Sequence, residues 1–187
     1  MILSFSRLAP LAGLFWLAGC FASETSLIPT DDAVLPVEGP MTVCLDSDDP
    51  CLDLVRDGDG YYAPSPDDTG ETVSVRFAPL IQAGGRQVFI AEAQLKPEDG
   101  PSYIYGLARR LSQPDARGAT MQIAALDCDE LSEETLAGFE AGGGVVEPGK
   151  VMGCRPVSLD QLKAVLLAAH RDGLAMDEWW KAHAEDL

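Results

Sequence analysis

An acidic stretch in the first third of the chain offers oxygen ligands for a calcium ion. Its aspartates are Asp46, Asp48, Asp49, Asp53, Asp57 and Asp59. Calcium takes about six to eight oxygens on a flexible loop, and an EF-hand needs acidic residues at its first and last ligand positions. With Gly60 at the glycine position of such a loop, Val55 and Pro66 fall on those two positions. The stretch is therefore interpreted as solvated turn residues, with Asp57 and Asp59 as the remaining candidates for calcium.

The two histidines, His170 and His183, are the other side chains suited to acid–base or metal chemistry. If one helix carried both, a rotation of about 100° per residue would place them on different faces, and Gly173 interrupts that helix. A two-histidine metal site is therefore not indicated, and no metal is predicted here. A small periplasmic hydrolase that uses acidic residues and His170 stays open as an alternative, although the chain has no Gly-x-Ser-x-Gly nucleophile motif.

Composition excludes several classes of partner. The chain has 187 residues with 13 basic and 30 acidic side chains, a formal net charge of −17. Because nucleic-acid phosphates need a basic surface, this acidic chain is not expected to bind nucleic acid.

The glycine run from Gly142 to Gly144 lacks the residues of a phosphate-binding or dinucleotide-binding loop, so no cofactor is predicted. An acidic surface instead suits a basic protein, from the cell envelope or from a host.

The N-terminal residues have the layout of an export signal. Arg7 precedes an apolar run that is shorter than a permanent membrane span, which needs about 20 apolar residues. Small residues then follow, as they do at a signal-peptide cleavage site. The run ends in Leu17, Ala18, Gly19 and Cys20. This segment resembles the lipobox of bacterial lipoproteins, and the resemblance covers the signal region alone.

The resemblance implies a lipid anchor on Cys20. In bacterial lipoproteins the signal is cleaved before this cysteine, whose thiol receives a lipid and whose new amine is acylated. Several acyl chains, such as palmitate, anchor a protein far better than one, because each buried CH₂ contributes about 0.8 kcal/mol. Phe21 stands where an aspartate favours retention in the inner membrane. The implied location is the bacterial cell envelope, with the protein anchored in the outer membrane and facing the periplasm.

If Cys20 carries lipid, an even number of cysteines remains in an exported protein. They are Cys44, Cys51, Cys128 and Cys154. An oxidising compartment then favours two disulfides. Of the possible connectivities, Cys44–Cys51 with Cys128–Cys154 is preferred, because each pair flanks a loop rich in Gly, Pro and Asp. A four-cysteine zinc site would need tight two-cysteine knuckles, and these are absent.

The elements that would position these residues divide the chain into three parts. Residues 1–19 are assigned to the signal peptide and residues 20–40, with three prolines, to a lipid-anchored flexible tether. Residues 41–187 form one globular domain. Its predicted strands cover 41–45, 72–78, 87–94, 103–109 and 119–126, and its helices cover 133–141, a segment capped by Ser158, and 177–184.

This order predicts an α+β fold, a small antiparallel β-meander sheet packed by one or two C-terminal helices and stapled by two disulfides. The predicted function is that of a lipid-anchored cell-envelope protein without enzymatic activity. Its domain would present an acidic surface to another envelope protein or to a cationic protein. The alternatives are the hydrolase and a module that binds a cation or a small ligand.

Overall fold

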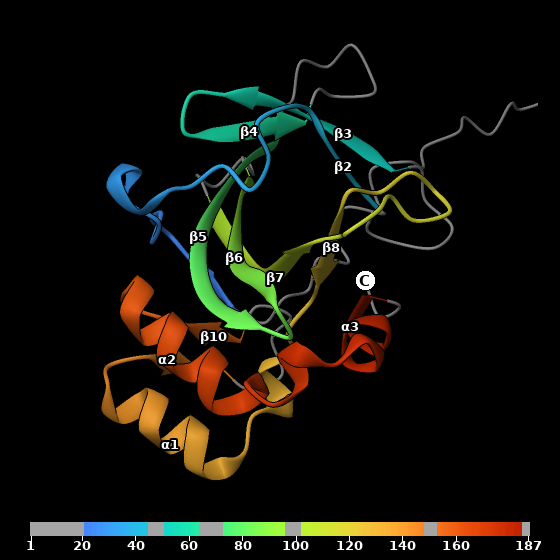
Figure 1. Ribbon diagram of the computed structural model, residues 1–187. Helices are drawn as coiled ribbons and strands as arrows, with labels where there is room; N and C mark the ends of the chain where they lie inside the picture. Colours follow the sequence, from blue (N-terminus) through green and yellow to red (C-terminus); the bar gives the residue numbers. More distant parts are fainter. Residues whose placement is uncertain (1–20, 45–50, 64–72, 96–101, 148–152, 185–187) are drawn as a thin grey trace, which may run out of the picture.

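A computed structural model describes residues 21–44, 51–63, 73–95, 102–147 and 153–184 (Figure 1). A β-barrel forms one part of the molecule, and short helices cover its outer surface on one side. The predicted calcium ligands Asp46, Asp48 and Asp49 and the predicted lipid attachment site Cys20 lie outside the described residues.

Seven strands close the barrel. They are β2 (Met41–Val43), β3 (Leu52–Asp57), β4 (Gly60–Ala63), β5 (Val73–Ala83), β6 (Arg86–Leu95), β7 (Ser102–Arg110) and β8 (Met121–Ala124). Neighbours from β2 to β8 along the chain pair antiparallel. The ring closes where Val43 of β2 pairs in parallel with Met121 of β8. Strand β1 (Ala22–Ser23) adds to β7 at Ile104 and Tyr103.

The prediction of a small open meander sheet packed by helices is therefore wrong. The antiparallel order is present, but the sheet curls until its last strand meets its first. Strands β5, β6 and β7 are long enough to twist substantially, and strand twist carries a sheet towards closure. A register shift between Pro79 and Ile81 adds a bulge, which bends β5 further. Alternating residues look the same in open and closed sheets, so the sequence pattern could not separate the two.

The central strands are buried on both faces. On β6, Phe89 and Ala91 join the core inside the barrel, whereas Val88 and Ile90 join a second core outside it. Successive residues of this strand thus point to opposite faces of the sheet. Because both faces of β6 are apolar and buried, other elements must cover this part of the barrel from outside.

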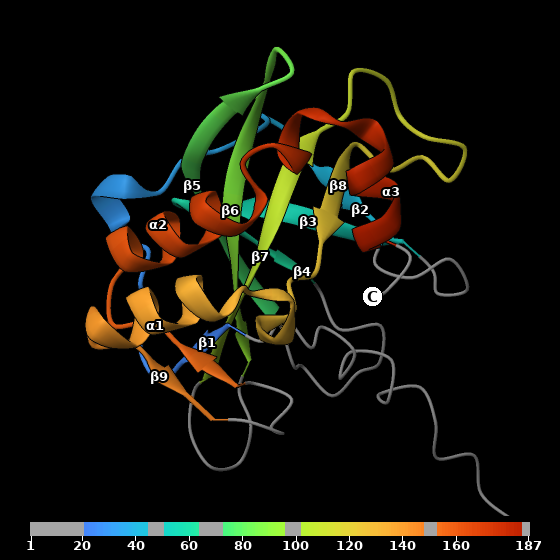
Figure 2. The same ribbon diagram turned by 90° about the horizontal axis from the view of Figure 1, so that it is seen from below.

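The C-terminal helices supply most of that cover. They are α1 (Glu133–Ala141), α2 (Leu159–His170) and α3 (Asp177–Ala184). Figure 2 shows α1 and α2 side by side against the barrel, and α3 beside β8. The predicted cap at Ser158 is confirmed, since its side chain accepts a hydrogen bond from the amide of Gln161. Ser132 caps α1 in the same way, by accepting from the amide of Thr135. None of the described helices has the length and apolar character needed to cross a membrane.

Both predicted disulfides form. Cys44 is bonded to Cys51 with Cα atoms 4.1 Å apart, and Cys128 is bonded to Cys154 with Cα atoms 5.9 Å apart. The first closes the connection between β2 and β3. The second joins the short helix η3 (Cys128–Glu130) to β10 (Cys154–Arg155), which pairs with β9 (Val145–Val146).

The segment from Phe21 onward, which was predicted as part of a tether, lies against the barrel. Phe21 is fully buried, contacts the Phe139 ring edge-on at 6.3 Å and forms a β-bridge with Cys154. Ile28 is also fully buried. The short helix η2 (Thr30–Asp32) follows. The described part of residues 20–40 therefore contributes to the outer core.

A buried carboxyl group, Glu92, holds this segment in place. Its oxygens accept hydrogen bonds from the Ser26 hydroxyl at 2.7 Å and from the amides of Leu27 and Ile28 at 2.8 and 3.1 Å. The Tyr105 hydroxyl donates a further bond at 3.0 Å. Only 2% of Glu92 is exposed, so these donors replace the water that a carboxylate loses on burial.

We expect Glu92→Ala to lower the free energy of unfolding by about 2–4 kcal/mol, because buried donors lose their acceptor. Glu92→Gln retains one acceptor oxygen and should lose less. Chemical denaturation followed by tryptophan fluorescence measures both changes. Glu38→Ala, at an exposed position, is the control and should change stability by about 0.5 kcal/mol or less. Equal stability of Glu92→Ala and the parent would contradict this account.

Candidate functional site

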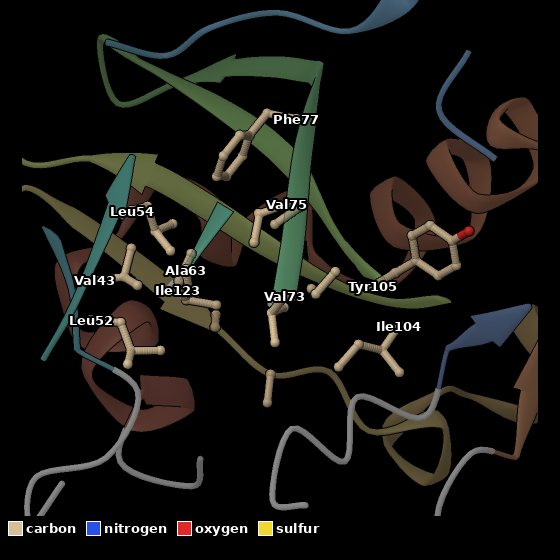
Figure 3. Close-up of a pocket in the computed structure, with 15 residues that line it drawn as sticks. Val43, Leu52, Leu54, Ala63, Val73, Val75, Phe77, Ile104, Tyr105 and Ile123 are labelled. Carbon is tan, nitrogen blue, oxygen red and sulfur yellow. The ribbon is translucent and has the colours of Figure 1, made fainter. Parts of the chain in front are cut away.

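The barrel encloses an apolar cavity, here called the barrel cavity, of about 70 Å³. Every barrel strand contributes to its wall, as Figure 3 shows for the labelled side chains. Leu52 and Leu54 reach it from β3, and Val73, Val75 and Phe77 reach it from β5. These three residues of β5 therefore share its inward face.

The cavity exists because one wall carries small residues. On β6, β7 and β8, and just beyond β8, the lining positions include Ala91, Ala93, Gly106, Ala124 and Ala125. These side chains cannot fill the space opposite the leucines and valines. A protein interior normally packs to a high density with few voids, so the alanines and the glycine of this wall, which lie beside the larger Ile104 and Ile123, leave the barrel partly unfilled.

Gly106 is required by a close approach between strands. A Cβ atom at this position would lie 2.9 Å from the carbonyl oxygen of Ala124. Real Cβ atoms essentially never lie that close to a backbone oxygen, so a side chain here would separate β7 from β8. The glycine thus allows β7 and β8 to approach closely, and it places no side chain in the cavity.

An aromatic cluster fills the adjoining part of the barrel interior. Phe77 contacts the rings of Tyr61 and Phe89 edge-on, with centroids 5.8 and 6.4 Å away. The Tyr61 hydroxyl donates to the carbonyl oxygen of Val37. Burial raises the pKa of Tyr61, so its phenol is neutral at pH 7. The cavity therefore ends against packed rings.

Among the described residues, the lining offers no group for acid–base chemistry. Tyr105 is the one polar side chain of this described lining, and its hydroxyl bonds to Glu92 and Ser23 on the outer side of the barrel. Burial raises the pKa of Tyr105 well above its usual value. A wall of aliphatic carbon binds apolar groups and cannot move protons. The cavity thus favours binding over hydrolysis.

The predicted calcium candidates lie away from this cavity, at the turn between β3 and β4. Asp59 lies 3.5 Å from the Arg76 guanidinium, which already supplies a positive charge. Asp57 pairs with Gly60 across the turn. Asp53 accepts a hydrogen bond from the Thr42 hydroxyl. Among the described residues, the group with metal-ligand geometry is a different one, formed by Glu130, His170 and His183.

The two histidines come together, contrary to the sequence argument that placed them on different faces. They belong to two helices, α2 and α3, and the chain turns back between them through η4 (Gly173–Ala175). Their ring centroids are 6.0 Å apart. A Cβ atom on Gly173 would lie 2.4 Å from the Trp179 ring, so this glycine permits the tight turn that joins the rings.

The barrel cavity was not predicted from the sequence, although a signal was present. The inward positions of β6 and β7 carry Ala91, Ala93 and Gly106 where a filled barrel would carry larger side chains. The signal becomes readable only when the inward face of each strand is known. Glu130 was missed because its partners are distant in sequence.

Comparisons with protein-family models, curated proteins and solved structures return no match.

We expect Leu54→Ala to lower the free energy of unfolding by about 2–4 kcal/mol, because it enlarges a cavity and removes buried contacts. Val55→Ala, at the next position and 38% exposed, is the matched control and should cost about 0.5 kcal/mol or less. Thermal and chemical unfolding both test the difference. Similar losses in the two variants would show that Leu54 does not line a packed interior.

Proposed function

We propose that the protein is an exported, lipid-anchored binding protein whose barrel holds the end of an aliphatic chain. The observation that carries the proposal is the apolar cavity lined by every barrel strand. Small-molecule sites are concave and mostly apolar. Barrels of similar strand number hold one small ligand where their interior is not filled by side chains.

The size of the cavity limits its ligand. A cavity of about 70 Å³ is smaller than the cavities of about 150 Å³ that hold benzene in protein cores. It suits the narrow end of an alkyl chain, with the rest of the ligand extending outward. The alternative of a small-ligand-binding module is therefore the one that the geometry favours.

The charge of the protein limits the polar part of the ligand. A formal net charge of −17 favours the approach of cations over that of anions. A fatty-acid carboxylate is therefore disfavoured relative to a neutral or cationic head group on the same chain.

Export and lipid attachment rest on the N-terminal sequence and agree with the fold. The disulfides Cys44–Cys51 and Cys128–Cys154 are compatible with an oxidising compartment. Phe21, the residue after Cys20, is buried in the domain. A lipid on Cys20 would then hold the domain close to the bilayer surface, where amphipathic chains are available.

A basic protein partner remains a second prediction, supported by the acidic composition alone. The cavity gives no support to the hydrolase alternative, because the lining residues that the structure describes include neither a carboxylate nor an imidazole.

Filling the cavity should abolish ligand binding. Ala93 lies opposite Val75 and Ile104, and all three line the cavity. We expect a neutral fluorescent probe with a free alkyl end, N-decyl dansylamide, to bind the parent through its decyl chain and Ala93→Phe to weaken that binding at least about tenfold, because the phenyl ring occupies the space. Fluorescence titration measures the dissociation constant.

Val55→Phe adds the same ring at an exposed position and should leave probe binding unchanged. In competition, decanol should displace the probe at lower concentration than decanoate. The cavity proposal fails if Ala93→Phe, folded by circular dichroism, binds the probe as the parent does.

Lipid attachment has its own test. In bacterial cells supplied with labelled palmitate, the parent chain should acquire the label and Cys20→Ser should not. Cys44→Ser, which breaks a disulfide, should keep the label, because it leaves the lipobox intact. Label retained by Cys20→Ser would refute the anchor and leave the cavity proposal untouched.

A further inference from the structure

A cluster of metal-ligating side chains lies outside the barrel, where α2, α3 and η3 meet. Glu130 comes from η3, His170 from the last residue of α2 and His183 from α3. One potential ligand atom from each residue lies within 4.8 Å of the other two. The Glu130 Oε2 atom is 3.5 Å from His183 Nε2.

His183 is oriented as a metal-binding histidine is. Its Nδ1 atom lies 2.8 Å from the carbonyl oxygen of Trp179, an acceptor, so Nδ1 carries the proton. The lone pair is then on Nε2, the atom that faces Glu130. A backbone carbonyl on the second ring nitrogen commonly sets the tautomer and orientation of a metal-ligating histidine.

His170 supplies an independent observation. Only 7% of this residue is exposed, and its Nε2 atom is buried without a hydrogen-bond partner. A buried polar atom without a partner is costly, and most such atoms in native proteins are satisfied. A neutral imidazole has one ring nitrogen with a free lone pair, which can bind a metal ion.

We propose that Glu130, His170 and His183 bind a divalent transition-metal ion of the zinc class. Two imidazoles and a carboxylate suit zinc and its first-row neighbours and do not suit calcium, which prefers oxygen ligands. Ligand atoms of a tetrahedral zinc site lie about 3.3 Å apart, given metal–ligand bonds of about 2.0–2.1 Å. The Glu130–His183 separation of 3.5 Å is close to this spacing, and the His170 ligand atom, within 4.8 Å of the other two, would move towards them when the metal binds.

Neighbouring residues fix the positions of the three side chains. Trp179 stacks on the His183 ring at 3.9 Å and contacts His170 at 5.4 Å. The backbone amide of Ala125 donates to the His183 carbonyl oxygen. The disulfide at Cys128 ties η3, and with it Glu130, to β10. Three protein ligands leave one position of a tetrahedral metal open to water.

Metal titration of the full chain tests the site. The chain is purified in detergent with its disulfides oxidised and without a polyhistidine tag, and zinc binding is measured by calorimetry. We expect one zinc ion per chain, with a dissociation constant in the micromolar range or below. Cobalt(II) should give the visible absorption of a tetrahedral site, and copper(II) should quench tryptophan fluorescence, because Trp179 stacks on His183.

The variants assign the ligands. His183→Gln and His170→Gln should each weaken zinc binding about 100-fold, and Glu130→Gln about tenfold. Glu133→Gln, which changes an exposed glutamate on the first turn of α1, should bind as the parent does. His183 is partly exposed, so His183→Gln should fold. This variant therefore tests the metal site even if His170→Gln does not fold.

Two results would overturn the proposal. One is the absence of zinc binding to the folded parent at about 100 μM metal. The other is unchanged affinity in a folded His183→Gln variant, which would place the metal elsewhere. Neither result bears on ligand binding in the barrel cavity, because the two sites share no residue.

Discussion

Strands β5, β6 and β7 carry apolar side chains on both faces, so both faces must be shielded from water. The rest of the structure follows from that constraint. One face of these strands carries Phe77, Phe89 and Ala91, and the other carries Val88, Ile90 and Leu107. Closing the sheet buries the first face inside a barrel. The second needs a separate cover, since hydrophobic burial is the main favourable term in folding. The N-terminal segment and the helices provide that cover from opposite ends of the chain.

The inner face explains the cavity. Seven strands surround a volume that side chains must fill, and the lining residues of β6 and β7 include alanine and glycine. Position 106 has no room for a side chain, because a Cβ atom there would collide with the carbonyl oxygen of Ala124. The same close approach that seals the barrel therefore keeps part of its interior empty.

The outer cover explains the histidine cluster. To stay on the barrel, the chain must reverse after α2, and Gly173 allows Trp179 to pack into that reversal. Gln122 donates to the carbonyl oxygen of Trp180, and Arg109, with a side chain 6% exposed, pairs with Asp177 at 2.7 Å. These contacts hold α3 against β8. His183 is thereby brought to His170, and the turn after β8 adds Glu130.

Local signals in the sequence determined the elements that depend on near neighbours. The serine caps set the starts of α1 and α2, alternation indicated which residues of β5 and β6 share a face, and cysteine spacing indicated both disulfides. Tertiary structure alone decided three other features. Closure needed Val43 to meet Met121, the N-terminal segment needed Glu92 as its acceptor, and the His170–His183 pair needed a reversal of the chain. Each joins groups distant along the chain, and a local pattern holds no information about which distant groups will meet.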